Sequence, residues 1–264
     1  MKNLILIISL FLLFSCSQDK TWTKARSIDL GKITPIGLTY SNGNIWLADG
    51  DHNQIVEINL EGEIQKVYDG FERPMHIDAN DGAIYIPEYG TDNIIILKNG
   101  QKTTMAIQDS LDAPAGVSIF KNEKAIADFY NHRILYFNGT KWISFGEEGK
   151  ASGEFYYPTD VQITKDKIYV ADAYNNRVQV FDKNGKAELV IGNSDGINAA
   201  TGVYVSDKQV FVTDFENDRV LVYNTKGTLM QIFEDDLEKP TDILMINKEI
   251  YVSCYKGKKI IVFQ

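Results

Sequence analysis

The sequence predicts an all-β protein, a six-bladed β-propeller built from four-stranded antiparallel blades. Two observations lead to this prediction: a repeat with spacings of 39 to 44 residues, and an order of strands and turns that recurs within each repeat. A fixed period of this length is typical of repeat architectures. Because four short strands fill each period, a radial arrangement that protects the strand edges is favoured. No stretch of the chain has sustained helical periodicity.

The repeat is marked by prolines, with an alanine where one of them is missing. Successive spacings are 39, 40, 44, 42 and 40 residues, which gives six units. The six slots are Pro35, Pro74, Pro114, Pro158, Ala200 and Pro240. A short apolar strand follows each slot, and the predicted strands are residues 37–40, 76–79, 116–120, 160–164, 202–206 and 242–246.

The fourth unit has the clearest internal order. Residues 167–172 form a β-branched and aromatic strand, residues 173–176 a turn, and residues 177–182 a second strand that alternates with period two. An Asn-Gly pair at 184–185 predicts a tight hairpin before the outer strand, residues 187–191. The corresponding hairpin glycines of the other units are Gly62, Gly100, Gly139 and Gly227.

The sixth unit ends at Gln264 after only three strands, so its outer strand is missing. Residues 24–31 have the length and alternation of that strand. Pairing them with the last unit closes the ring, whereas an open solenoid would need polar caps. We therefore predict one propeller domain over residues 24–264.

The first fifteen residues differ from the rest of the chain. Lys2 is their only charge, and the apolar run from Leu4 to Phe14 is shorter than the about 20 residues of a membrane span. This pattern is typical of a secretory signal peptide, and Leu13-Phe14-Ser15-Cys16 resembles the lipobox of bacterial lipoproteins. We expect lipidation at Cys16, a short tether over residues 16–23, and a periplasmic or cell-surface location on a bacterial membrane. The alternative is cleavage nearby with loss of Cys16.

Charge excludes one class of partner, and cysteine content indicates how the domain is stabilised. A net charge of -9 argues against nucleic acid as a partner, because phosphates require a basic surface. Cys254 has no partner if Cys16 is acylated, so a hydrophobic core must supply the stability. Cys254 is interpreted as a small buried residue, since no histidine or carboxylate is obviously paired with it. We expect a monomer.

Three units carry an Asp-x-x-Asn-x-Arg motif between their second and third strands, which resembles the signature of NHL repeats. Because the Asp ends one strand and the Arg begins the next, the two can form a charge-assisted contact across the turn. A motif that recurs around a ring specifies the fold and cannot mark a single active site. Its residues are Asp128, Asn131, Arg133, Asp172, Asn175, Arg177, Asp214, Asn217 and Arg219.

The position two residues after each slot alternates between glycine and a polar side chain. The polar members are His76, Asp160 and Asp242, on every second unit, so in a six-bladed ring they surround one end of the channel with threefold spacing. One imidazole and two carboxylates suit a divalent metal such as zinc, calcium or manganese. The alternative is that the aspartates accept backbone hydrogen bonds and His76 is an ordinary channel residue.

A further resemblance is to peptidylglycine α-amidating lyase, carried by residues 158–161 and 168–178. That family holds zinc with histidines that directly follow the proline slots. In this chain the residues at those following positions are Met75, Ala115, Thr159 and Thr241. Asp242 falls where that family places a calcium-binding aspartate. Gluconolactonase-like propellers use a first-blade Glu that has no counterpart here. The resemblance implies, as one function, a metal-dependent lyase or hydrolase with its site at the channel mouth.

The other function is a non-enzymatic binding module that presents an aromatic and acidic rim to an extracytoplasmic protein, peptide or glycan. Aromatic side chains are favoured in recognition surfaces, although packing against the next blade is an alternative interpretation. The predicted rim residues are Tyr89, Tyr130, Tyr174, Phe215 and Tyr255.

Overall fold

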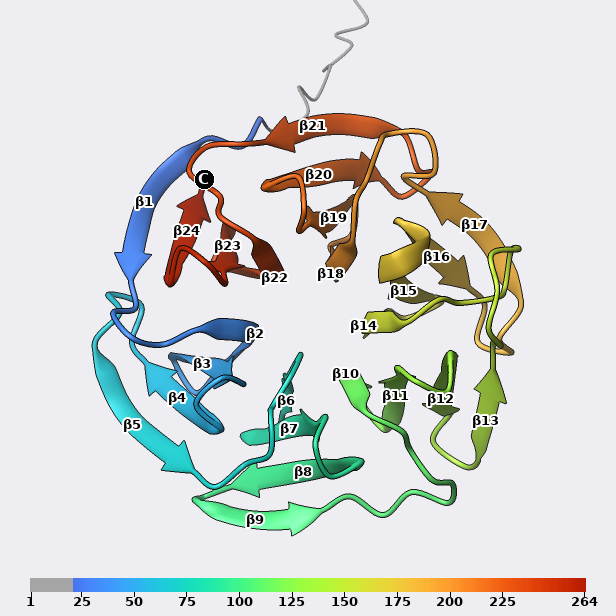
Figure 1. The fold of residues 1–264 in the computed structure, drawn as a ribbon, viewed down its shortest axis with the longest axis horizontal. Helices are drawn as coiled ribbons and strands as arrows, with labels where there is room; N and C mark the ends of the chain where they lie inside the picture. Colours follow the sequence, from blue (N-terminus) through green and yellow to red (C-terminus); the bar gives the residue numbers. More distant parts are fainter. Residues whose placement is uncertain (1–20) are drawn as a thin grey trace, which may run out of the picture.

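The structure, a computed structural model that describes residues 21–264, is a closed ring of six four-stranded antiparallel sheets (Figure 1). The predicted fold class is therefore confirmed. The predicted signal peptide and the predicted lipidation site Cys16 lie outside the described residues. Among residues 21–264, no helix has the length and apolar character needed to cross a membrane.

Each blade contains four strands, ordered from the channel outward. Blade 1 consists of β2 (Pro35–Ser41), β3 (Asn44–Asp49), β4 (Gln54–Ile58) and β5 (Ile64–Asp69). Blade 2 consists of β6 (Asp78–Asn80), β7 (Ala83–Glu88), β8 (Asn93–Lys98) and β9 (Gln101–Thr104). Blade 3 consists of β10 (Pro114–Phe120), β11 (Glu123–Asp128), β12 (Arg133–Phe137) and β13 (Trp142–Phe145).

The second half of the chain repeats this order. Blade 4 consists of β14 (Pro158–Ile163), β15 (Ile168–Asp172), the 3₁₀ turn η1 (Ala173–Asn175), β16 (Arg177–Phe181) and β17 (Ala187–Ile191). Blade 5 consists of β18 (Ala200–Val205), β19 (Gln209–Asp214), β20 (Arg219–Asn224) and β21 (Leu229–Phe233). Blade 6 consists of β22 (Pro240–Ile246), β23 (Glu249–Cys254), β24 (Lys259–Phe263) and β1 (Lys24–Asp29).

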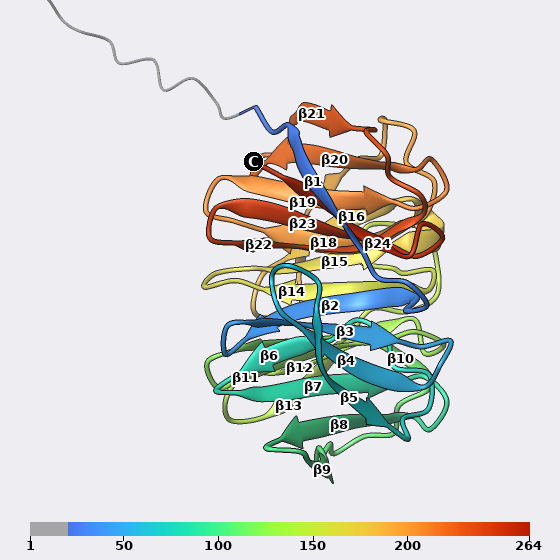
Figure 2. The same ribbon diagram turned by 90° about the vertical axis from the view of Figure 1, so that its left-hand side faces the viewer.

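The ring closes as the sequence predicts. Strand β1 pairs antiparallel with β24, with Ile28 opposite Ile260 (Figure 2). Just before β1, Trp22 is buried and its ring meets Phe211 of blade 5 edge-on, with centroids 5.7 Å apart. The beginning and end of the described chain are thus held together in one blade, with an apolar contact to the neighbouring blade.

The inner strand of blade 2 differs from the prediction. It was expected over residues 76–79, but the ladder within the blade begins only at Asp78. The backbone N–H of His76 donates to Ala115 O of blade 3, at 3.0 Å, and His76 forms an isolated parallel bridge with Gly116. The two preceding residues still pair with β7, because Pro74 bridges Glu88 and Met75 N donates to Pro87 O at 3.1 Å, but Pro87 has no N–H to donate in return.

Apolar side chains of adjacent blades pack against one another and form the core. Between blades 4 and 5, for example, Val180 and Val203 belong to one buried cluster that also contains Tyr223. Because every blade uses both faces in this way, most residues of the second and third strands are buried. Burial of such side chains is the main favourable contribution to folding.

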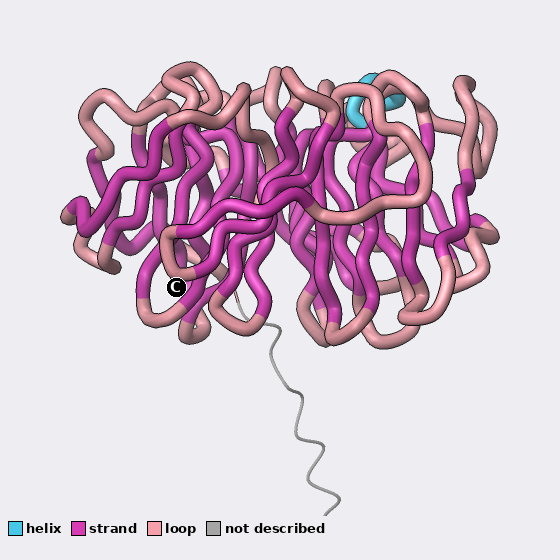
Figure 3. The backbone as a smooth tube through the Cα atoms, turned by 90° about the horizontal axis from the view of Figure 1, so that it is seen from below, coloured by secondary structure: helices cyan, strands magenta, loops and turns pink. Residues whose placement is uncertain are grey.

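The ring has two distinct faces. The turns between second and third strands, including η1, lie on the upper face in Figure 3, whereas Gln264 lies toward the lower face, together with Thr23, to which it is joined by two backbone hydrogen bonds. Each inner strand begins near the upper face at its proline slot. The polar residues that follow the slots therefore lie near the upper end of the central channel.

Candidate functional site

The NHL-like motif forms a polar cluster under each upper turn. In blade 4, Asp172 is fully buried and its Oδ2 accepts a hydrogen bond from Arg177 Nε at 2.8 Å. Asn175 Nδ2 donates to the same carboxylate at 2.9 Å, and Tyr156 N donates to Oδ1 at 2.8 Å. The other guanidinium nitrogens of Arg177 donate to carbonyl oxygens of the preceding loop, among them Lys150 O at 2.8 Å. The arginine thus ties the turn to the loop and does not form a bidentate contact with the aspartate.

Blades 3 and 5 repeat this arrangement. Arg133 Nε lies 2.7 Å from Asp128 Oδ2, and Arg219 Nε lies 2.7 Å from Asp214 Oδ2. All three aspartates are completely buried. Their hydrogen-bonding capacity is used within the turns, which gives the motif a structural role in these blades.

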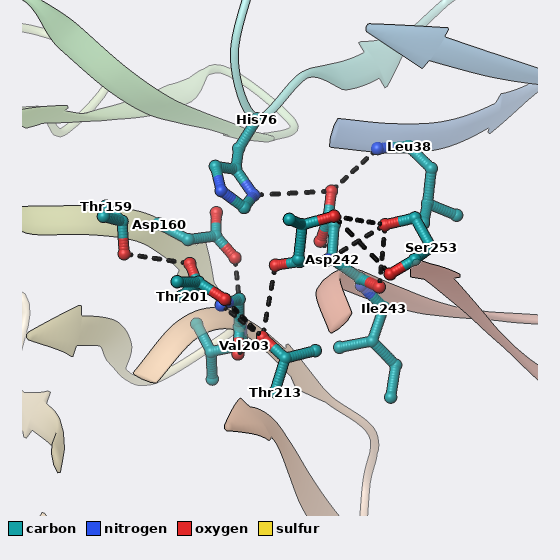
Figure 4. A network of polar contacts seen from close by, with 12 residues as sticks. Leu38, His76, Thr159, Asp160, Thr201, Val203, Thr213, Asp242, Ile243 and Ser253 are labelled. Atoms are coloured by element: carbon teal, nitrogen blue, oxygen red, sulfur yellow. Dashed lines mark hydrogen bonds and ion pairs between the residues drawn. The ribbon is translucent and has the colours of Figure 1, made fainter. Parts of the chain in front are cut away.

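The structure brings His76, Asp160 and Asp242 together near the upper end of the channel (Figure 4). One candidate ligand atom from each residue lies within 4.8 Å of the others. All three residues are buried, with exposed fractions of 3%, 7% and 6% respectively. The threefold spacing of the sequence therefore becomes an inward-facing triad, which lies inside the channel and not on an exposed rim.

The alternation with glycine has a steric reason. At Gly37, an added Cβ would lie 2.4 Å from Met75 O and 2.7 Å from His76 Cα of the next blade. Gly116 and Gly202 approach Asp160 and Asp242 in the same way. The three glycines let inner strands come into backbone contact in pairs, and this contact brings the three polar residues of the triad inward.

Both aspartates of the triad also bridge neighbouring strands. Asp160 accepts hydrogen bonds from Val161 N and from Val203 N of blade 5, each at 2.8 Å. Asp242 accepts from Ile243 N at 2.7 Å and from Leu38 N of blade 1 at 2.8 Å. The aspartates could therefore accept these backbone hydrogen bonds and also bind a metal ion, because each carboxylate oxygen has a second lone pair after accepting one N–H.

His76 is different, because its Nδ1 is buried without a hydrogen-bond partner. Asp242 Oδ2 lies 3.6 Å from His76 Nδ1, a distance that is longer than a hydrogen bond. Burial opposes the charged imidazolium, but the carboxylates of Asp242 and Asp160 outweigh this effect and raise the pKa of His76. Burial also raises the pKa of Asp160 to about 7. Two members of the triad thus have shifted pKa values, as is common at functional sites.

Asp78 is a further carboxyl group near the triad, half-buried, that the sequence did not single out. It accepts hydrogen bonds from Ala79 N at 2.7 Å and from Ile119 N of blade 3 at 2.6 Å, which repeats the bridging pattern of Asp160. Burial raises the pKa of Asp78 to about 7. Its position four residues after the slot, two beyond His76, kept it out of the alternating series.

A cavity of about 360 Å³ occupies the channel below the triad. Its wall runs from Asp160 and Asp242 down the inner strands to Tyr40, which is 36% exposed. Asp78 also lines it, and no lysine or arginine is among the lining residues. The channel therefore carries acidic groups without compensating cations and favours a positively charged occupant.

Aromatic side chains gather on the upper turns of blades 2 to 4. Three of the predicted rim residues, Tyr89, Tyr130 and Tyr174, lie in one group; Tyr130 is 47% and Tyr174 60% exposed. Ring contacts with centroids 4.5 to 5.9 Å apart connect them through residues that sequence analysis missed. This aromatic patch consists of Tyr89, Phe129, Tyr130, His132, Tyr156, Tyr157 and Tyr174.

The other two predicted rim residues lie apart from the aromatic patch. Phe215 and Tyr255 contact each other across blades 5 and 6, with ring centroids 6.3 Å apart. Tyr255 also donates its hydroxyl to Asp51 of blade 1 at 3.0 Å, and Lys239 lies 5.5 Å from the Phe215 ring. These contacts give the pair a packing role between blades.

Cys254 is fully buried, and burial raises the pKa of its thiol to about 11. Since the thiolate is the nucleophile, we expect native protein at pH 8 to resist alkylation by iodoacetamide. Unfolding in guanidinium should expose the thiol to rapid labelling, measured at the Cys254 peptide by mass spectrometry. Equal labelling rates in the native and unfolded states would contradict this expectation.

Comparison with known proteins agrees with the fold. Residues 155–181 match the family model of the NHL repeat, a segment that contains Asp172, Asn175 and Arg177 of blade 4. No curated protein matches the chain.

Several solved structures are similar over most of the chain. Streptogramin B lyase has a TM-score of 0.68 at 18% identity, covering 92% of this chain and 87% of its own. A catalytically inactive virginiamycin B lyase from Staphylococcus aureus with quinupristin has a TM-score of 0.67 at 18% identity, covering 91% and 84%. BamB from Moraxella catarrhalis has a TM-score of 0.59 at 11% identity, covering 93% and 98%. Taken with the six blades and the motif geometry, these matches identify the chain as a six-bladed β-propeller that contains an NHL repeat in its fourth blade.

Proposed function

We propose that the chain is a lipid-anchored, extracytoplasmic binding module whose recognition surface is the aromatic patch. The observation that carries this proposal is the continuity of the patch, which joins seven rings over three blades and leaves Tyr130 and Tyr174 exposed. Tyrosine supplies a large contact area and a polar hydroxyl with few rotatable bonds, which makes it a favoured residue of recognition surfaces. A protein segment, peptide or glycan fits this chemistry.

The position of the chain's first described residues supports this role. Thr23 pairs with Gln264 through two backbone hydrogen bonds and lies with it toward the lower face, whereas the aromatic patch is built on the turns of the upper face (Figure 3). A lipid anchor at Cys16 would therefore hold the lower face toward the membrane and direct the patch away from it. Two or three acyl chains suffice for durable anchoring.

The exposed tyrosines provide the test of this proposal. We expect the double change Tyr130→Ala and Tyr174→Ala to weaken capture by about 2 kcal/mol or more, the loss typical of central aromatic contacts. Capture can be measured with glycan arrays and with crosslinking of extracytoplasmic protein followed by mass spectrometry. Tyr40→Ala is the matched control, because Tyr40 is 36% exposed at the other end of the channel. Unchanged capture by the double variant would sink the proposal.

A second candidate function, a metal-dependent lyase or hydrolase, is favoured by one specific observation. Asp160 and Asp242 line the end of a cavity of about 360 Å³ and converge there with His76, which is an arrangement that suits a small-molecule site. Three of the similar solved structures are lyases. This function requires a bound metal ion, whereas recognition by the aromatic patch does not, so the two candidates can be tested separately.

A further inference from the structure

We propose that His76, Asp160 and Asp242 bind one divalent transition-metal ion of the zinc class at the upper end of the central channel. The candidate ligand atoms lie within 4.8 Å of one another, and each residue comes from a different inner-strand segment (Figure 4). The independent observation is His76 Nδ1, which is buried and has no hydrogen-bond partner. A buried polar atom without a partner costs about 1–3 kcal/mol, and coordination of a metal would satisfy it.

The spacing of the triad is wider than that around a bound zinc ion. In a tetrahedral site the ligand atoms lie about 2.0–2.2 Å from zinc, so two of them are about 3.3–3.6 Å apart. The separation of up to 4.8 Å in the structure therefore requires the ligand atoms to approach one another by about 1 Å or more. Rotation of the His76 ring, whose Nδ1 makes no hydrogen bond, can supply part of this movement.

The donor set decides the class of metal. Calcium takes six to eight oxygen ligands and magnesium retains several waters, whereas a neutral imidazole is a ligand typical of zinc and other transition metals. Three protein ligands also leave a coordination position open, as in catalytic zinc sites. The backbone N–H groups of Val203 and Leu38 hold the two aspartates in place and act as outer-shell supports.

The channel provides an entry path for the ion and space beside its open coordination position. The cavity reaches from Asp160 and Asp242 to the exposed Tyr40, and its lining residues include Asp78 but no lysine or arginine. An ion that enters along this acidic channel meets the triad at the end of the cavity. Its open position would face the cavity, where a small ligand could reach it.

The test is titration of the chelator-treated protein with Zn²⁺ alone, followed by calorimetry and by metal analysis after desalting. We expect one ion per chain and a rise in the melting temperature on addition of the metal, because an ion that binds only the folded state stabilises it. His76→Gln and Asp160→Asn should weaken binding by more than the roughly 10–100-fold that follows loss of an outer-shell partner. Co²⁺ in place of Zn²⁺ should give a visible absorption band that both variants lose.

Asp78→Asn is the matched control, because Asp78 is a half-buried carboxyl group with the same two-strand bridging pattern but is not a member of the triad. It should keep the ion within about threefold of the parent affinity even if its stability falls. Absence of stoichiometric binding to the parent protein would overturn the proposal, as would binding that survives in folded His76→Gln and Asp160→Asn variants. Metal binding without lyase or hydrolase activity would reject the second candidate function and leave the metal site intact.

Discussion

Replacement of Arg177 with alanine is expected to lower the free energy of unfolding by about 3–5 kcal/mol, the loss that follows removal of one partner from a buried ion pair. Asp172 is completely buried, and the Arg177 side chain is only 7% exposed. Without the guanidinium, the carboxylate keeps Asn175 and Gln179 as donors but loses its only cationic partner among the contacts of the turn. The carbonyls of Lys150 and Ala151 lose their donor at the same time.

Urea denaturation followed by circular dichroism measures this loss. Arg219→Ala is the matched control, because Arg219 Nε makes the same ion pair with buried Asp214 but the Arg219 side chain is 17% exposed, which lets water replace part of the interaction. We expect a smaller loss for the control. A loss below about 1 kcal/mol for Arg177→Ala would show that the motif does not stabilise the turn through its charge pair.

The repeat explains why the fold could be predicted from the sequence. Each blade contains local sequence signals for its strands and turns, such as the Asn-Gly hairpin at 184–185, where Gly185 has a φ of +81°. Pairing of residues 24–29 with β24 followed from the missing strand of the sixth unit, although the two segments lie at opposite ends of the chain. Local patterns of this kind depend little on tertiary context, so they can be read directly.

The triad was predictable for the same reason, and its surroundings were not. The alternation of His76, Asp160 and Asp242 with glycine is a property of the repeat, and symmetry turns it into proximity. The burial of the triad depends on how closely the inner strands approach at Gly37, and this distance is set by the packing of whole blades. The unpartnered Nδ1 of His76 is likewise visible only once all neighbouring atoms are placed.

The aromatic patch illustrates the opposite case. Tyr156 and Tyr157 precede the fourth proline slot and lie outside the turns between second and third strands, where the sequence predicts the rim residues. The fold places them between the turns that carry Tyr130 and Tyr174, with the rings of Tyr157 and Tyr174 5.2 Å apart. The aromatic patch thus combines residues from different positions within the repeat. Aligning the six units and comparing the same position in each does not reveal such a surface.

Gly37→Ala is expected to destabilise the protein by about 1–3 kcal/mol, the cost of overpacking a well-packed interior. The new Cβ would lie 2.4 Å from Met75 O and 2.7 Å from His76 Cα, and both are backbone atoms that cannot rotate away. The inner strands of blades 1 and 2 must therefore separate, which moves His76 relative to the two aspartates. We expect weaker Zn²⁺ binding together with the lower stability.

Gly139→Ala separates this effect from backbone strain. Gly139 has a φ of +93°, and its nearest neighbour for an added Cβ is Asn122 Cβ at 3.8 Å, so the substitution strains the hairpin without a clash. We expect it to cost about 1–2 kcal/mol and to leave Zn²⁺ affinity unchanged. If Gly37→Ala were as stable as the parent protein, the close approach of the inner strands would not be a requirement of the ring. If Gly37→Ala lowered stability but left Zn²⁺ affinity unchanged, the position of His76 would have to be set by its backbone hydrogen bond to Ala115, on the far side of the strand, and not by the contact with blade 1.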